Sequence, residues 1–181
     1  ILAAKAAKIC VAYDGMDRFF SMDKILFTGN PVRKDILDNK IHQQEALKTL
    51  GLDQNKKTLL IFGGSLGART INEAVLANAD AISKRVDINI IWQVGKIYYD
   101  SIKDCSLSSC SHVKILPFID NMDVAYSASN LVVCRAGALT ISELAVLGKA
   151  AILIPSPNVA EDHQTFNAKS LVDKNAAIMI S

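Results

Sequence analysis

Residues 58–68, TLLIFGGSLGA, contain the pattern that decides the fold: an apolar run, a cluster of glycines and the start of an amphipathic stretch. The continuous apolar run at residues 58–62 is typical of a strand buried on both faces of a sheet. Glycines end this run, and residues 67–82 have the pattern of a helix. The stretch therefore predicts a buried strand, a tight turn and a helix, in that order.

The same alternation recurs along the chain. Further helices are predicted at residues 41–50, 97–103, 122–128, 139–147 and 162–174, and further strands at residues 24–27, 88–94, 113–116, 130–134, 150–154 and 176–180. Repeated alternation of strands and helices predicts an α/β fold in which a parallel sheet carries helices on both faces. Residues 101–111, rich in Ser and Cys, interrupt the alternation, and we interpret them as a surface loop.

Composition narrows the function classes. The chain has 181 residues, which suits one domain, and its net charge of +2 does not favour a general nucleic-acid binder. No apolar run approaches the ~20 residues that a membrane span needs, and we find no signal peptide. The cysteines and histidines are scattered, so we expect no metal site and no cofactor. The chain begins without Met and ends on a predicted strand, which suggests truncation at both ends.

The segments that follow the predicted strands are the most polar, glycine-rich and proline-rich of the sequence. They are residues 29–33, 63–68, 93–96, 117–119, 135–140 and 155–164. In open parallel sheets, ligands bind outside the carboxyl ends of the strands. We therefore expect these segments to converge on one binding rim.

The first glycine turn, residues 63–68, lies between the strand and the helix described above. Free backbone N–H groups at a helix start, together with the helix dipole, favour an anion, and Ser65 could add a hydroxyl donor. The alternative is a tight turn in which glycines serve only geometry. The order strand, turn, helix favours phosphate binding. The turn is neither GxGxxG nor a P-loop, so a nicotinamide-dependent oxidoreductase is not favoured.

A second glycine turn, residues 135–140, has the same position between a predicted strand and helix. A second anion site on the same rim suggests a diphosphate ligand. We expect Glu143 in the first turn of the following helix, where its carboxylate could accept both hydroxyls of a ribose. Thr140 and Glu143 also have the spacing of a capping box, in which the carboxylate only satisfies a backbone N–H. Spacing alone does not separate these two readings.

Three further features allow both a functional and a structural interpretation. Residues 161–167, EDHQTFN, place imidazole and amide groups at a helix start, which suits sugar hydroxyls but also suits a solvated helix end. Arg33 could reach a sugar or a phosphate, although most lone arginines are simply solvated. Phe118 could cap a flat base or pack in the core.

The sequence resembles the MurG-type family, the undecaprenyl-diphospho-muramoylpentapeptide N-acetylglucosaminyltransferases of bacterial cell-wall synthesis. Five stretches carry the resemblance, in family order: residues 28–36 (TGNPVRKDI), 59–75 (LLIFGGSLGARTINEAV), 90–96 (IIWQVGK), 115–144 (ILPFIDNMDVAYSASNLVVCRAGALTISEL) and 154–168 (IPSPNVAEDHQTFNA). The chain of motifs is specific, although each motif alone would not be.

The resemblance implies one half of a GT-B glycosyltransferase, which has two Rossmann-like domains. Residues 1–181 would form the carboxyl-terminal UDP-sugar-binding domain, with the amino-terminal acceptor domain and its catalytic residues absent. One departure is Leu66, which stands where the family commonly has Gln.

The resemblance also implies roles for individual residues. Gly64 and Ser65 would bind the diphosphate, Phe118 and the backbone of Ile119 would recognise uracil, and Glu143 would hold the ribose hydroxyls. Ala138, Leu139 and Thr140 would form the second phosphate turn. Arg33, His163 and Gln164 would face N-acetylglucosamine or its phosphate.

The implied activity is transfer of N-acetylglucosamine from UDP-N-acetylglucosamine to a lipid-linked muramoyl-pentapeptide acceptor. The whole enzyme would associate peripherally with the cytoplasmic face of the bacterial inner membrane, and this piece alone would be soluble and inactive. The alternatives are a non-catalytic nucleotide-sugar-binding module and another GT-B UDP-sugar transferase.

Overall fold

A computed structural model describes residues 2–157, 159 and 162–180. Its main feature is a parallel sheet with strand order β5-β4-β3-β6-β7-β8. The strands are β3 (Lys57–Phe62), β4 (Ile88–Gln93), β5 (Val113–Leu116), β6 (Leu131–Cys134), β7 (Ala151–Leu153) and β8 (Ile178–Met179). The chain runs outward from β3 to β5, then returns to the middle at β6 and runs outward the other way. The strand order therefore reverses between β3 and β6, and α/β folds bind ligands at such a point.

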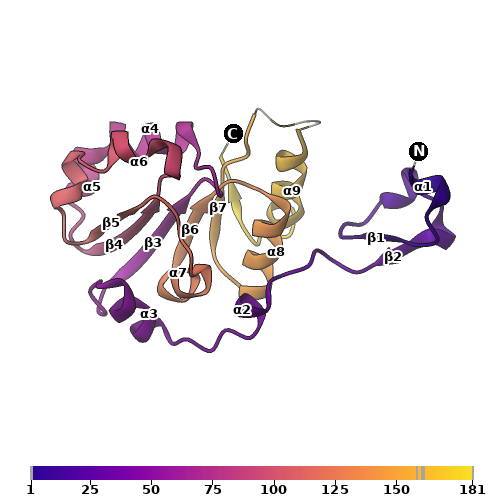
Figure 1. The fold of residues 1–181 in the computed structure, drawn as a ribbon, viewed down its shortest axis with the longest axis horizontal. Coiled ribbons are helices and arrows are strands. Elements are labelled where there is room, and N and C mark those ends of the chain that lie inside the picture. The colour runs from indigo at the N-terminus through magenta and orange to yellow at the C-terminus, as the bar shows by residue number, and fades with distance from the viewer. Residues whose placement is uncertain (1, 158, 160–161, 181) are drawn as a thin grey trace.

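Helices cover both faces of this sheet, which confirms the predicted fold class (Figure 1). Side chains alternate along the buried strands, so Leu60 and Phe62 join one core while Ile61 joins the other. The first core includes residues of α2 (Lys34–Leu37), α3 (Gln43–Leu50), α7 (Met122–Ala128), α8 (Ala138–Leu147) and α9 (His163–Val172). The second includes residues of α4 (Arg69–Ala77) and α6 (Lys96–Ile102).

Two predicted segments differ in detail. The helix expected at residues 67–82 is divided into α4 and α5 (Ala79–Ser83) at Asn78, whose side-chain amide donates to the Ala74 carbonyl at 2.8 Å. Asn competes with the helix for backbone groups, which explains the break. The loop expected at residues 101–111 contains the end of α6 and a short 3-10 helix, η3 (Ser106–Ser109), whose Leu107 is fully buried. The interpretation of residues 101–111 as a surface loop was therefore wrong at η3, which contributes Leu107 to the core.

The amino-terminal part forms a second, smaller sheet. Strand β1 (Ile9–Val11), which the sequence analysis missed, pairs in parallel with β2 (Ile25–Phe27). This small sheet, with α1 (Leu2–Lys5) and the 3-10 helices η1 (Met16–Arg18) and η2 (Met22–Lys24), projects away from the main sheet (Figure 1). Residues 29–33 therefore reach the binding rim as a connecting segment, and our expectation that they follow a strand of the main sheet was wrong.

Candidate functional site

A pocket of about 310 Å³ opens where the strand order reverses. We call it the switch-point pocket. Its lining comes from the connecting segment, from the ends of β3 and β4, and from the residues after β5 and β6. The lining residues are Pro31, Arg33, Phe62, Gly64, Ser65, Gln93, Phe118, Ile119, Met122, Leu139, Thr140 and Glu143.

The first glycine turn forms one wall of this pocket. Gly64 has φ +91°, and its carbonyl accepts a 2.9 Å hydrogen bond from the Gly67 N–H, which closes the turn before α4 begins. Gly67 has φ +79° and packs so closely on the end of β4 that an added Cβ would collide with the Val94 carbonyl oxygen. The glycines therefore have a geometric role as well, and Gly64, unlike Gly67, faces open space.

A buried hydrogen-bond chain anchors α4 behind the turn. The Asn72 amide donates to the Val94 carbonyl at 2.8 Å, and its oxygen accepts from the Trp92 indole at 3.1 Å. All three residues are nearly inaccessible to solvent. Because buried polar groups are costly to leave unpaired, this chain fixes the start of α4 against β4.

The second glycine turn forms the facing wall. Helix α8 starts after Gly137, and Leu139 and Thr140 line the pocket from its first turn. Ala138 lies beside them without lining the pocket, and its carbonyl accepts from the Asn30 amide at 3.4 Å. That contact ties the connecting segment, and with it the pocket residue Arg33, to the start of α8.

Glu143 lies one turn further along α8 than the sequence suggested. Because the helix begins at Ala138, Glu143 is in its second turn, and the N-cap is Gly137. Glu143 accepts a 2.9 Å hydrogen bond from the Tyr126 hydroxyl. The capping-box reading with Thr140 at the N-cap is therefore wrong, and the Glu143 carboxylate lines the pocket instead.

Phe118 and Ile119 line the pocket at the end of β5. The ammonium group of Lys96, at the start of α6, lies 5.3 Å from the centroid of the Phe118 ring. Gln93, which is 4% exposed, donates to the Pro117 carbonyl at 3.4 Å and supports this corner from below. The result is an aromatic ring beside backbone polar groups, an arrangement that suits a flat heterocycle.

The remaining predicted residues divide into two groups. Arg33 lines the pocket, is half-exposed and forms an ion pair with Asp35 at 3.3 Å. Gln164 lines a neighbouring pocket of about 480 Å³ on the other side of the first glycine turn, where its side-chain oxygen accepts from the Ser156 N–H at 2.9 Å. His163 is exposed at the start of α9 and lines neither pocket, and Glu161 lies outside the described residues.

Comparison with known proteins identifies the family. The family model of the glycosyltransferase family 28 C-terminal domain matches residues 58–181. The chain belongs to this family.

Curated relatives agree with this assignment and with the resemblance to MurG-type enzymes. The chain is 50% identical to the "UDP-N-acetylglucosamine--N-acetylmuramyl-(pentapeptide) pyrophosphoryl-undecaprenol N-acetylglucosamine transferase" of Bacteroides fragilis over 99% of its own length and 48% of the relative's. It is 53% identical to the protein of the same name from Parabacteroides distasonis, covering 100% and 49% of the two chains. The chain thus spans about half the length of the curated relatives it matches.

Solved structures share the fold. The MurG structure from Acinetobacter baumannii superposes with a TM-score of 0.68 at 32% identity, covering 99% of this chain and 48% of that one. The glycosyltransferase WaaG, at 15% identity and a TM-score of 0.59, matches in fold alone, covering 96% and 49% of the two chains.

In this family 28 domain, the pocket also has lining residues to which the sequence analysis gave no individual role. Pro31, Phe62, Gln93 and Met122 line the pocket, and Tyr126 holds Glu143 from behind. Pro31 and Gln93 lie in the polar segments that were expected to form the rim. Phe62 belongs to a predicted strand, and only its position at the end of that strand could have pointed to it. Nothing in the sequence pattern marks Tyr126.

Burial controls the acid–base behaviour behind the pocket. Burial and the nearby Glu143 carboxylate raise the pKa of Tyr126 far above its usual range, so the phenol remains a proton donor. The same two causes raise the pKa of the fully buried Cys134 thiol to about 12. Cys134 is therefore a neutral core residue.

The structure describes residues 2–157, 159 and 162–180 of this family 28 domain. In that part, no helix is long and apolar enough to cross a membrane. Among the described residues, no group of three or more His, Cys, Asp or Glu side chains is arranged to hold a metal ion.

Proposed function

We propose that this chain is the donor-binding domain of an N-acetylglucosaminyltransferase and that the switch-point pocket binds the UDP part of UDP-N-acetylglucosamine. The observation that carries the proposal is the arrangement of two glycine turns on facing walls of one pocket, with an aromatic corner and a carboxylate between them. Two helix starts suit a diphosphate, and the remaining groups suit a uridine. The names of the relatives support the choice of sugar nucleotide.

The proposed contacts come from the lining of the pocket and from Ala138 beside it. Gly64 and Ser65 contact the diphosphate, and Ala138, Leu139 and Thr140 form the opposite phosphate turn. Phe118 stacks on uracil, and the backbone of Ile119 forms hydrogen bonds with the polar edge of the uracil ring. Glu143 accepts the ribose hydroxyls, and Arg33 contributes a cation at the entrance.

The sugar ring would extend across the first glycine turn into the neighbouring pocket. Gly64 lines the switch-point pocket, while Gly63 and Gly67 line the neighbouring one together with Gln164. The amide of Gln164 suits a sugar hydroxyl, and His163 lies next to it at the start of α9. We therefore propose both residues for the N-acetylglucosamine side of the donor.

In the whole enzyme, a hydroxyl oxygen of the acceptor sugar would attack the anomeric carbon of the donor while the bond from that carbon to the diphosphate breaks. The hydroxyl proton passes to a base, and UDP leaves with the bonding electrons. The starts of α4 and α8 stabilise the charge that develops on the leaving diphosphate. We propose that the base and the acceptor site belong to a preceding domain.

The acceptor named by the relatives is a lipid-linked muramoyl-pentapeptide. We propose the same acceptor for the whole protein, with peripheral association at the cytoplasmic face of the membrane where such a lipid is presented. In this proposal, the present chain supplies donor binding and no transfer by itself. A non-catalytic nucleotide-sugar-binding module and a GT-B transferase with a different acceptor are the remaining alternatives.

Calorimetric titration of the chain with UDP, UDP-N-acetylglucosamine and NAD tests the proposal. The two uridine nucleotides should bind and NAD should not.

Ser65→Ala should weaken UDP more than uridine, because the proposed contact of Ser65 is with phosphate. Equal losses for UDP and uridine would remove Ser65 from the phosphate site, and tight NAD binding would overturn the donor assignment. Transfer of the sugar to a lipid-linked acceptor by this chain alone would contradict the proposal that the base and the acceptor site belong to another domain.

A further inference from the structure

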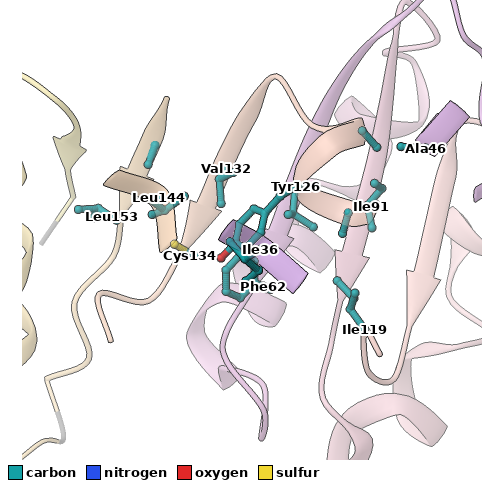
Figure 2. Packing of buried hydrophobic residues seen from close by; sticks show 14 of the residues in the cluster. Ile36, Ala46, Phe62, Ile91, Ile119, Tyr126, Val132, Cys134, Leu144 and Leu153 are labelled. Atoms are coloured by element: carbon teal, nitrogen blue, oxygen red, sulfur yellow. The ribbon is translucent and has the colours of Figure 1, made fainter. Parts of the chain in front are cut away.

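The side chain of Tyr126 lies in the hydrophobic core, and its hydroxyl is the only polar group of that side chain. Tyr126 is fully buried on α7, and its ring meets the Phe62 ring edge-on, with centroids 6.2 Å apart at 74°. Figure 2 shows the ring among Phe62, Val132 and Cys134. A buried phenol needs a hydrogen-bond partner, and this one donates to Glu143 Oε2 at 2.9 Å.

This hydrogen bond joins the core to the pocket. Glu143 is partly buried and lines the switch-point pocket, whereas Tyr126 does not line it. A carboxylate has two oxygens with about four acceptor positions. The bond to Tyr126 occupies one position on Oε2 and fixes a side chain that otherwise rotates about three torsions. The rest of its acceptor capacity stays available to a ligand.

The tyrosine ring itself is rigidly placed. It packs edge-on against Phe62 of β3 in a core cluster that also includes Ile36, Val132 and Cys134, and close packing of this kind holds the ring in place. The phenol also stays protonated across the working pH range, because burial and the carboxylate both raise its pKa. Tyr126 therefore presents a permanent donor at a fixed point.

We propose that Tyr126 is the positioning residue of the pocket, which holds the Glu143 carboxylate in the orientation that accepts a vicinal diol of the ligand. This inference rests on the proposed function, in which that diol is the ribose of UDP. Preorganisation of this kind raises affinity because the ligand does not have to immobilise the side chain itself. The effect should be confined to ligands that carry the diol.

The test compares UDP with 2′,3′-dideoxy-UDP on the wild-type chain and on Tyr126→Phe, which keeps the ring and removes the hydroxyl. Without the hydroxyl, UDP itself has to immobilise the Glu143 side chain, so Tyr126→Phe should weaken UDP binding by about twofold to tenfold. The dideoxy nucleotide should bind both chains alike. Tyr99→Phe is the matched control, because Tyr99 is half-buried against the core on the other face of the sheet and should change neither affinity.

Glu143→Gln and the double variant separate this inference from the proposed function. In the Tyr126→Phe background, Glu143→Gln should cost less UDP affinity than in the wild type, because the carboxylate is no longer held. If Glu143→Gln weakens UDP but Tyr126→Phe does not, the positioning role is wrong and the ribose role stands. If Glu143→Gln leaves UDP affinity unchanged, the ribose role itself is wrong.

A purely structural role for Tyr126 has a different signature. Tyr126→Phe would then weaken UDP and its dideoxy form by the same factor, in step with a lower melting temperature. Melting is therefore measured on every variant, and all titrations are made at a temperature where each variant is folded. Equal weakening of both nucleotides overturns the positioning role.

Discussion

At the scale of a single residue, Glu143 connects the buried core of this domain to its pocket. Its carboxylate contacts a fully buried phenol on one side and lines a solvent-accessible pocket on the other. A helix start at Ala138 places Glu143 in the second turn of α8, too far along the helix to cap it. A partly buried carboxylate needs hydrogen-bond donors, and the Tyr126 hydroxyl supplies one of them, which leaves acceptor positions on the pocket side for the proposed ligand.

Glu143→Gln tests the ligand role without breaking the fold. The amide oxygen of Gln can still accept from Tyr126, so we expect near-normal melting, but the anionic acceptor is lost. A hydrogen bond to a charged group is worth about 1.5–3 kcal/mol, so UDP affinity should fall by roughly one to two decades. Calorimetry with UDP and 2′,3′-dideoxy-UDP provides the check. If removing the ribose hydroxyls penalises the variant as strongly as the wild type, Glu143 does not bind them.

Cys134 provides a prediction about pH. Its buried thiol has a pKa near 12, against an ordinary value near 9.0, so the folded chain keeps a proton that the unfolded chain releases between these pH values. This contribution to stability is complete below about pH 9 and is lost as the pH rises toward 12. At pH 10 the loss should be about 1.4 kcal/mol. Urea unfolding at pH 7 and pH 10 should show a smaller drop for Cys134→Val than for the wild type, and equal drops would contradict the prediction.

At the scale of elements, the position of the first glycine turn is set by backbone contacts that leave no room for side chains. Gly67 lies against the end of β4, and an added Cβ at Gly95 would in turn meet the Leu66 carbonyl oxygen. The chain from Trp92 through Asn72 to the Val94 carbonyl fixes α4 in the same place. These contacts hold the start of α4 at the pocket, so the turn is preformed.

Gly67→Ala and Gly64→Ala form a matched pair that tests this packing. Both glycines have positive φ, so each Ala bears a backbone strain of about 1–2 kcal/mol. Only the Ala at position 67 would also collide with the β4 backbone. We expect Gly67→Ala to lower the free energy of unfolding clearly more than Gly64→Ala, which should fold and lose UDP affinity instead. Similar losses of stability in urea unfolding would mean that the turn is not packed on β4.

At the scale of the whole molecule, the sequence predicts the main sheet better than the arrangement around it. Buried strands and their glycine turns are local patterns, so the main-sheet strands and the pocket-lining positions Gly64, Ser65, Leu139 and Thr140 could be found from them. The separate small sheet could not, because strand pairing is not local and Ile9–Val11 is short. Tyr126 was missed for the same reason, since its role depends on a contact between two helices.

Because the small sheet and the main sheet are separate, we predict that residues 28–181 alone fold and bind UDP. The small sheet shares no strand pairing with the main one within the described residues, and a two-stranded sheet adds little stability by itself. The pocket residues Pro31 and Arg33 lie beyond it, in the segment that Asn30 ties to Ala138 and Ser142 of α8. Removing residues 1–27 therefore keeps every residue that lines the pocket and the Asn30 bonds to α8, and it removes the Val11 carbonyl that accepts from the Gly29 N–H at 3.2 Å.

We expect the shortened chain to unfold cooperatively in urea and to bind UDP within about threefold of the full chain, since no proposed ligand contact is removed. A chain shortened further, to residues 34–181, is the control. It lacks Pro31, Arg33 and the Asn30 tether, so it should fold but bind UDP more weakly. If the first deletion already abolishes folding or weakens UDP binding tenfold, the small sheet is an integral part of the binding domain. If the second deletion binds UDP as well as the first, the connecting segment has no part in the pocket's function.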